Sequence, residues 1–566
     1  MLELNKKPFY LQEEAEKWVY KTLENMSVDE KIGQLFCPIG YATDKGYLQN
    51  EFIHRHVGGL MFRQADSNAL YETYGYLQEQ AKIPMLLAAN LEAGGTGLLT
   101  DGTSFGMPLQ VAATNDEQMA YALGDISCAE ASSVGCNFAF APIVDIDLNY
   151  HNPITNVRTF GSDQNKVIEY GRQYIKAAKK HQVVTSIKHF PGDGVDERDQ
   201  HILTSVNSLD KEAWDESFGK VYQELINEGS LAVMAGHIAL PSYQEYFSKE
   251  EAFKIIPASL SKELLQDLLR KQLGFNGLII TDATPMVGFC AAMEREKAVP
   301  LAIEHGCDMF LFNKDLAEDI EYMHKGYKDG LLSQKRLDEA VIRILATKAA
   351  IGLPEKAKNK QLLPKKEQLS IVGCDAHTKL AKTCADKAIT LVKDTQRILP
   401  LSAKKYKRVL LQILGDCDSN IRVYAQFANT LRINGFEVYP YAKEGFDENG
   451  SMQVDSVEQF KHKYDLVMYI ANIENASNKT TNRINWFTFF GQGNNIPWFV
   501  EEVPTLFVSV ANPYHLLDVP MIKTYVNCYS NNTHVIEACM DKLLGKSEFK
   551  GVNPIDPFCS RKELEY

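Results

Sequence analysis

Residues that transfer protons gather in one stretch, SIKHFPGDGVDERDQH, at residues 186–201. Asp199 and His201 stand two positions apart in it, so in a turn the carboxylate can orient the imidazole and raise the proton affinity of its other nitrogen. A histidine held in this way can pass a proton to a leaving group. The alternative is a polar turn without a chemical role, and the spacing by itself favours this alternative.

A further carboxylate, Asp282, ends the apolar run GLIITDA at residues 277–283. A carboxylate in that place can act as a nucleophile, a general base or a metal ligand. The residues ATPM that follow also allow Asp282 to be the N-cap of a helix, which is the commoner role for an isolated aspartate. Its meaning therefore depends on the groups that lie beside it.

Hydrogen-bond donors accompany these acids. Lys188 and His189 end the run VVTSIKHF, and Arg158 lies in NVRTFGSD, so the three could hold sugar hydroxyls or a carboxylate. A metal site would need more convergent His and carboxylate ligands, so it is the less favoured interpretation, although HFPGDG and AGHIAL leave it open.

Eight short apolar runs must position these residues. Most are bounded by Gly, Pro or Asn and lack strict alternation, which is typical of strands buried on both faces. Because helical segments separate them, they indicate an α/β fold with a (β/α)8 TIM-like barrel, and a doubly wound open sheet is the main alternative. The runs cover residues 31–39, 57–63, 84–90, 137–147, 183–190, 231–240, 277–283 and 307–312.

Polar side chains follow nearly every one of these runs. In a barrel, the carboxyl ends of the strands meet at one end, which is the catalytic face. The residues placed there are Arg63, Asn90, Glu92, Asp145, Asp147, Lys188, His189, His237 and Asp282.

A second domain is expected after the barrel. We expect the barrel at residues 1–352, a Lys- and Pro-rich linker at 353–369, and a smaller α/β sandwich at 370–566. Its six apolar runs, separated by helical segments, predict a mainly parallel sheet. No GxGxxG or Walker A motif supports a nucleotide site.

Composition narrows the class of protein. The net charge of -13 argues against nonspecific nucleic-acid binding, which depends on phosphate neutralisation. The 11 scattered cysteines include no CxxC pair and suggest a reducing compartment. The first residues lack a signal-peptide core, and no apolar run reaches the length of a membrane span. We therefore expect a soluble, cytoplasmic protein, as a monomer or homodimer.

Six motifs, in order and at similar spacing, resemble glycoside hydrolase family 3. They are MSVDEKIGQLF, NLEAGG, NVRTFGSD, KHFPGDGVDERDQH, VMAGHIALP and GFNGLIITDATPM, and KAITLVKDTQRILPL and VSVANPYHL are similar to that family's second domain. The loop at 186–201 resembles the signature of the β-N-acetylglucosaminidase branch. β-Glucosidases of the family instead take an acid/base Glu from the second domain.

The resemblance implies a retaining double displacement on a small carbohydrate, without metal or cofactor. Asp282 would be the nucleophile, His201 the acid/base, and Asp199 the residue that orients His201. Sugar would be bound by Lys188, His189, Arg158, Asn90, Arg63 and His237. In this branch the substrate is typically a terminal β-linked GlcNAc of muropeptide- or chitin-type saccharides, which would suit peptidoglycan recycling.

Two residues depart from the family pattern. Asn90 replaces an Asp that binds sugar hydroxyls, and Asp193 stands where His or Leu is common and could be only a turn residue. The leading hypothesis is an exo-acting β-N-acetylhexosaminidase. A phosphorylase that uses phosphate as acceptor is the alternative within enzymes, and a catalytically weak sugar-binding protein is the third hypothesis.

Overall fold

The structure, a computed structural model, describes residues 2–248, 255–441, 445–446, 448, 452–489, 492–493 and 495–566. The chain divides into two compact units. The first contains residues 1–105 and 117–378, and the second contains residues 106–116 and 379–566. A short segment of the chain before residue 117 therefore belongs to the second unit.

A parallel barrel forms the first unit. Seven strands make one sheet in the order β10-β8-β6-β5-β4-β3-β2, and β1 pairs with β11. All eight predicted runs contain a strand: β1 (Phe36–Cys37) with β2 (Ile39–Gly40), β3 (Gly59–Phe62), β4 (Leu86–Ala89), β5 (Phe138–Ala139), β6 (Val184–Phe190), β8 (Ala232–Ala235), β10 (Leu278–Thr281) and β11 (Phe310–Leu311).

Two short links close the sheet into a barrel. Strand β11 lies beside β10 through the parallel bridge between Ile280 and Met309, and it pairs on its other side with β1. Strands β1 and β2 are one extended segment interrupted at Pro38, which has no N–H to donate. This closure confirms the predicted (β/α)8 fold and excludes a doubly wound open sheet for the first unit.

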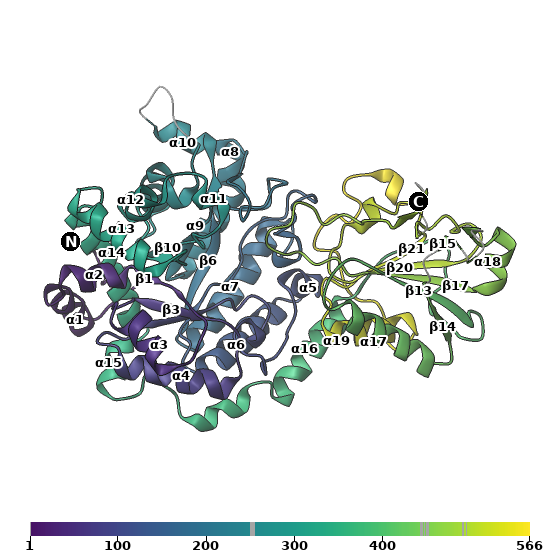
Figure 1. Cartoon of the computed structure of the whole chain (residues 1–566), viewed down its shortest axis with the longest axis horizontal. Helices are drawn as coiled ribbons and strands as arrows, with labels where there is room; N and C mark the ends of the chain where they lie inside the picture. Colours follow the sequence, from purple (N-terminus) through teal and green to yellow (C-terminus); the bar gives the residue numbers. More distant parts are fainter. Residues whose placement is uncertain are drawn as a thin grey trace. The chain divides into compact units, whose positions relative to one another are not determined.

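Helices cover the outside of the barrel, as Figure 1 shows for α4, α6, α7 and α12–α14. Helix α2 (Val28–Gln34) replaces the first half of the predicted run 31–39, because Ser27 and Glu30 form a capping box that starts a helix there. The other covering segments are α4 (Ser67–Gln80), α6 (Glu117–Ser133), α7 (Gln164–Lys180), α9 (Lys220–Glu228), η6 (Glu263–Gln272), α12 (Arg295–His305), α13 (Leu316–Lys328) and α14 (Gln334–Ala350).

The second unit is a six-stranded sheet with helices packed on it. Its five parallel strands are β14 (Glu437–Pro440), β13 (Arg408–Leu414), β17 (Leu466–Ala471), β20 (Thr505–Ser509) and β21 (Thr524–Asn527), and β12 (Thr390–Asp394) is antiparallel at the edge. Helices α17 (Asn420–Ile433) and α19 (Thr533–Leu543) lie along one side (Figure 1). The expected mainly parallel sheet is confirmed.

The segment expected to be a linker is structured. It contains α15 (Leu353–Lys358) and the start of η7 (Lys366–Ile371), and the Tyr71 hydroxyl donates to the Pro364 carbonyl at 2.8 Å. The first unit ends at residue 378, beyond the linker expected at 353–369. The domain bounds expected from the sequence stay a prediction. Within the described ranges, no helix is long and apolar enough to cross a membrane.

Candidate active site

The residues singled out from the sequence follow the barrel strands at their carboxyl ends. Asn90 follows β4, Lys188 and His189 end β6, His237 follows β8, and Asp282 follows β10. Parallel strands bring these ends to the same rim. Neighbouring strands thus place acids and donors from distant parts of the chain on one end of the barrel.

Asp282 is held at the rim by its own loop. Its N–H donates to the Ala235 carbonyl at 2.8 Å, and its Oδ1 accepts from the Ala283 N–H at 2.7 Å. Burial raises the pKa of this carboxyl, but the charges of His189, His237 and His201 outweigh burial and lower the pKa below its ordinary value. The residue at the N-cap position of helix α11 (Val287–Cys290) is Met286, four positions after Asp282, so the N-cap interpretation of Asp282 is wrong.

His237 supports that loop from behind. The Ala283 carbonyl can only accept, so Nε2 of His237 donates to it at 2.9 Å, and Nδ1 accepts from the Ser259 hydroxyl at 2.8 Å. The imidazole is fully buried, and burial lowers the pKa of His237. Both ring nitrogens are therefore engaged within the protein, Nε2 with the residue that follows Asp282 and Nδ1 with Ser259.

Asp199 and His201 form the pair that their spacing suggested. The Nδ1–H of His201 donates to Asp199 Oδ1 at 2.6 Å, and its backbone N–H donates to the same oxygen at 2.9 Å. Asp199 is fully buried, whereas the side chain of His201 is 21% exposed. The carboxylate fixes the tautomer, so Nε2 is the nitrogen that Asp199 does not hold.

The loop of this pair is attached to the Asp282 loop. The Val287 N–H donates to the His201 carbonyl at 3.0 Å, and the His237 N–H donates to Gln200 Oε1 at 2.7 Å. His201 and Val287, which are 86 positions apart in sequence (287 − 201), are thereby held side by side. The segment that contains Asp199 and His201 is therefore more than a local polar turn, because hydrogen bonds join it to other loops of the barrel.

His189 presents one nitrogen to Asp282. Its Nδ1–H donates to Asp145 Oδ2 at 2.7 Å, and its backbone N–H donates to Asp145 Oδ1 at 3.0 Å. The remaining nitrogen, Nε2, lies 3.9 Å from Asp282 Oδ2. Asp145 thus orients this ring as Asp199 orients that of His201.

Glu92 joins the two cations that were expected to hold sugar. Its Oε1 accepts from Lys188 Nζ at 2.6 Å, and its two oxygens accept from Nη2 and Nε of Arg158 at 3.0 and 3.1 Å. Burial opposes the charge of Glu92, but Arg158 and Lys188 prevail and hold the pKa of this carboxyl far below its ordinary value. The three side chains form a compact, charged cluster beside the Asp282 loop.

Two predicted sugar-binding residues stay apart from these networks. Arg63 is exposed and stacks over the Tyr41 ring at 5.8 Å, and Asn90 is exposed at the end of β4. They follow β3 and β4, which are neighbours in the sheet, so both lie on the same rim. No described residue ties either side chain to Asp282.

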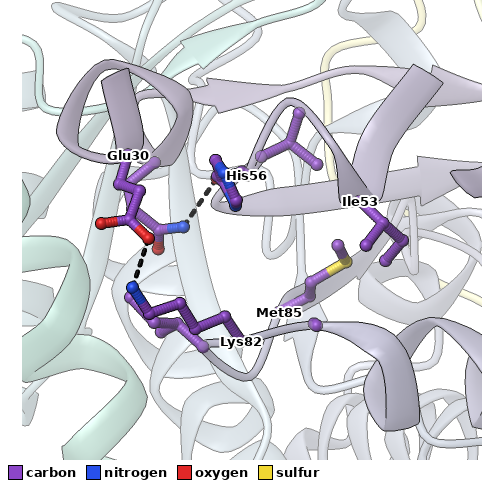
Figure 2. A pocket seen from close by; sticks show the side chains of 9 residues that line it. Glu30, Ile53, His56, Lys82 and Met85 are labelled. Atoms are coloured by element: carbon purple, nitrogen blue, oxygen red, sulfur yellow. Dashed lines mark hydrogen bonds and ion pairs between the residues drawn. The ribbon is translucent and has the colours of Figure 1, made fainter. Parts of the chain in front are cut away.

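A small pocket lies at the other end of the barrel (Figure 2). Its lining residues, which include Glu30, His56, Lys82 and Met85, precede β1, β3 and β4 rather than follow them. Its volume of about 20 Å³ holds roughly one water molecule. This pocket is too small for a sugar.

Glu92 and Asp145 are the supporting residues whose roles sequence reasoning missed. Their position after strands was noted, but nothing in the sequence pairs Glu92 with Arg158, 66 positions away, or Asp145 with His189, 44 positions away. The only available signal was an acidic residue at the end of an apolar run.

The sequence matches a known family and is similar to several known proteins. The family described as "Glycosyl hydrolase family 3 N terminal domain" matches residues 27–347. A protein of Cellulomonas fimi described as "Beta-N-acetylglucosaminidase/beta-glucosidase" is 42% identical over 99% of both chains. "Beta-hexosaminidase A" of Pseudoalteromonas piscicida is 26% identical over 64% of this chain and 63% of its own.

Solved structures give the same fold over both units. "Beta-glucoside phosphorylase BglX bound to 2FGlc" superposes with a TM-score of 0.92 at 42% identity, covering 98% of this chain and 99% of its own. A family 3 β-N-acetylglucosaminidase of Paenibacillus sp. str. FPU-7 has a TM-score of 0.76 at 21% identity, covering 94% and 99%, which supports the fold alone.

Proposed function

The chain belongs to glycosyl hydrolase family 3, and from this premise we propose that it is a retaining, exo-acting enzyme that cleaves terminal β-linked GlcNAc. One observation carries the proposal: Asp282 and the Asp199–His201 pair sit on loops that are hydrogen-bonded to each other at one rim of the barrel. A carboxylate nucleophile and a separate proton donor are the two groups that a double displacement needs.

In the first step, Asp282 attacks the anomeric carbon and forms a glycosyl-enzyme ester. The lowered pKa keeps Asp282 ionised, which nucleophilic attack requires. His201 carries the proton on Nε2 to the leaving oxygen, while Asp199 stabilises the imidazolium through Nδ1. In the second step, His201 takes a proton from the acceptor and the ester is cleaved.

Donors around the anomeric position bind the sugar. Lys188 and Arg158 are oriented by Glu92, and His189 is oriented by Asp145, so these donors are fixed before substrate arrives. Asn90 and Arg63, on the adjacent rim, are proposed to contact the more distant hydroxyls. His237 acts through Ala283 rather than on the sugar, because both its ring nitrogens are already bonded.

Phosphate as the acceptor is a second candidate, favoured by a specific observation. The proteins described as "Beta-glucoside phosphorylase BglX" are 41–42% identical to this chain over 98–99% of its length. A histidine acid/base adds no fixed negative charge to the site, so an anionic acceptor can approach where a second carboxylate would repel it. Because these two relatives are described as acting on β-glucosides, β-glucosides should be compared with β-GlcNAc glycosides as donor substrates.

Product analysis separates the candidates. p-Nitrophenyl β-GlcNAc and β-glucoside are incubated with the protein, with and without phosphate, and the sugar product is identified. Free sugar alone supports hydrolysis, and a sugar 1-phosphate formed only with phosphate supports phosphorolysis. Absence of turnover on the whole panel contradicts both and leaves the sugar-binding hypothesis.

Asp282→Ala tests the nucleophile. We expect turnover to fall by at least about 10³-fold, because the ester can no longer form. Added azide should restore release of the aryl group and yield a glycosyl azide of inverted configuration. Glu197→Gln, on an exposed residue of the neighbouring loop, is the matched control. Near-normal activity of Asp282→Ala contradicts the mechanism.

A further inference from the structure

Arg295, the first residue of α12, binds the loop that follows β10 and carries Asp282. The edge of its guanidinium formed by Nε and Nη2 donates to Oδ1 and Oδ2 of Asp319 at 2.7 and 2.6 Å. The edge formed by Nη1 and Nη2 donates to the Thr284 carbonyl at 3.2 Å and to the Thr284 hydroxyl at 3.1 Å. We propose that Arg295 is a positioning residue that, held by Asp319, fixes Asp282 through Thr284. This proposal rests on the proposed role of Asp282 as the nucleophile.

The guanidinium is itself fixed before it reaches the loop. Asp319, on α13, is fully buried, and its Oδ2 also accepts from Asn313 Nδ2 at 3.2 Å. The guanidinium carbon lies 5.8 Å from the centre of the Phe310 ring, on β11. A bidentate carboxylate and an aromatic ring together restrict both the plane and the direction of Arg295.

Thr284 is the residue of the loop that Arg295 contacts. Its N–H donates to the Leu311 carbonyl at 2.8 Å, and its hydroxyl donates to the Phe312 carbonyl, so both groups are tied to the end of β11. Its own carbonyl accepts from Arg295 and from the Cys290 thiol, which is 3.2 Å away. Without Arg295 this carbonyl would keep only a thiol, which is a weak donor.

The position of Asp282 depends on the peptide groups that follow it. Its Oδ1 accepts from the Ala283 N–H at 2.7 Å, so a movement of this peptide moves the carboxylate. His237 holds the Ala283 carbonyl at 2.9 Å, and Arg295 holds the next carbonyl, that of Thr284. Two side chains from different elements thus hold consecutive residues directly after Asp282.

Helix α12 does not account for an arginine at its first position. The N-terminus of a helix carries partial positive charge, so a cation there is unfavourable for the helix. The side chain of Arg295 is largely buried against the loop instead of extending into solvent. The contacts with Asp319 and Thr284 are therefore what an arginine at this position provides.

The same loop also sets the distance to the proposed proton donor. Beyond Thr284, the Val287 N–H donates to the His201 carbonyl at 3.0 Å, and the Gly288 carbonyl accepts from the Thr204 hydroxyl at 2.9 Å. A loop released from Arg295 would shift against the His201 segment as well as against the sugar.

Arg295→Ala tests the proposal in glycosylation by a dinitrophenyl β-glycoside, whose leaving group needs no proton from His201. We expect kcat for this step to fall by about 10–100-fold, because misplacement of a reacting group by about 1 Å can cost that much. KM should change little, since Lys188 and Arg158 lie on other segments. An unchanged kcat would overturn the proposal.

Added guanidinium ion distinguishes positioning from a general loss of structure. At concentrations well below those that unfold proteins, it can bind between Asp319 and Thr284 in Arg295→Ala and should restore much of kcat. Arg172→Ala is the matched control, because Arg172 forms ion pairs with Glu224 and Glu228 on partly exposed positions. This control should retain full activity without added guanidinium. A loss in Arg295→Ala that guanidinium does not relieve would mean a structural role only.

Arg295→Lys serves if Arg295→Ala does not fold. Lysine keeps the charge, but a single ammonium cannot bind Asp319 and Thr284 with two planar edges. We expect this variant to lose kcat in a similar way. Full activity of Arg295→Lys would overturn the proposal, because charge alone would then suffice.

Hydrogen exchange of residues 282–290 gives a readout that needs no turnover. The N–H groups of Asp282, Thr284 and Val287 are hydrogen-bonded within the barrel, so they should be protected in the wild type. Arg295→Ala should exchange faster in this segment and guanidinium should slow it again, while β10 keeps its protection. Unchanged exchange would overturn the proposal. If the wild type cleaves no glycoside but exchange responds as expected, the proposed function fails and the fixing of this loop by Arg295 stands.

Discussion

At the scale of single residues, the charge of the proposed acid/base matters, and in this respect His201 differs from a carboxylate. It can donate a proton as an imidazolium and then be neutral, whereas a carboxylic acid becomes an anion beside Asp282. Asp199 is fully buried and accepts two hydrogen bonds from His201, so it supplies the orientation. In the proposed mechanism, Asp199 holds the ring and His201 moves the proton.

His201→Ala should slow substrates according to their leaving groups. We expect a loss of about 10²–10⁴-fold on an alkyl or sugar β-glycoside, because the leaving oxygen must be protonated. Glycosylation by a dinitrophenyl glycoside should be nearly unaffected. The measurement is pre-steady-state release of the leaving group. An equal loss on both substrates would mean that His201 has a structural role only.

At the scale of elements, Glu92 forms ion pairs that connect three segments of the barrel rim. It follows β4, Lys188 lies on β6, and Arg158 ends the short helix η3 (Asn156–Arg158). Removing the carboxylate leaves two largely buried cations without their partner, which destabilises a fold more than the loss of an exposed ion pair. The cluster thus couples the stability of the rim to the placement of Lys188 and Arg158, the proposed sugar donors.

Glu92→Gln tests this coupling. We expect the free energy of unfolding to fall by about 3 kcal/mol at neutral pH, and KM to rise. Because folding lowers the pKa of Glu92 from its ordinary value of 4.5, its contribution is present above that value and is lost as pH falls through the folded pKa. The difference from wild type in denaturant unfolding should therefore narrow in acid. Glu294→Gln, on an exposed residue, is the control.

At the scale of the whole molecule, the two units are not two consecutive stretches of chain. Helix α5 (Pro108–Ala113) belongs to the second unit, where the Val552 N–H donates to the Ala113 carbonyl at 2.9 Å and Lys387 Nζ pairs with Asp116 at 2.8 Å. Leu109 is fully buried there. Cutting the chain at the unit boundary therefore separates α5 from its packing partners.

A fragment of residues 1–378 should consequently be poorly soluble. The apolar face of α5 becomes exposed when residues 379–566 are removed. Replacing residues 107–115 in the fragment by a Gly/Ser linker should recover soluble protein, as measured by yield and size-exclusion chromatography. A monomeric, soluble unmodified fragment would contradict this expectation.

The strands and the residues that follow them could be predicted because their signals are local. Each apolar run carries its own hydrophobic pattern, and closure of a parallel barrel places whatever follows the strands on one rim. The pairing of His201 with Asp199 was predictable for the same reason, since two positions separate them. The short helix α2 was not, because its capping residues Ser27 and Glu30 lie within or beside an apolar stretch.

The amino-acid sequence by itself determined the fold class, the end of the barrel where the proposed catalytic residues lie and the types of group available there. Only the tertiary structure decided which groups touch: that Glu92 joins Lys188 to Arg158, that His237 faces Ala283, and that Asp193 lies under Asp145. These contacts join segments tens of residues apart, and their geometry depends on how the loops pack.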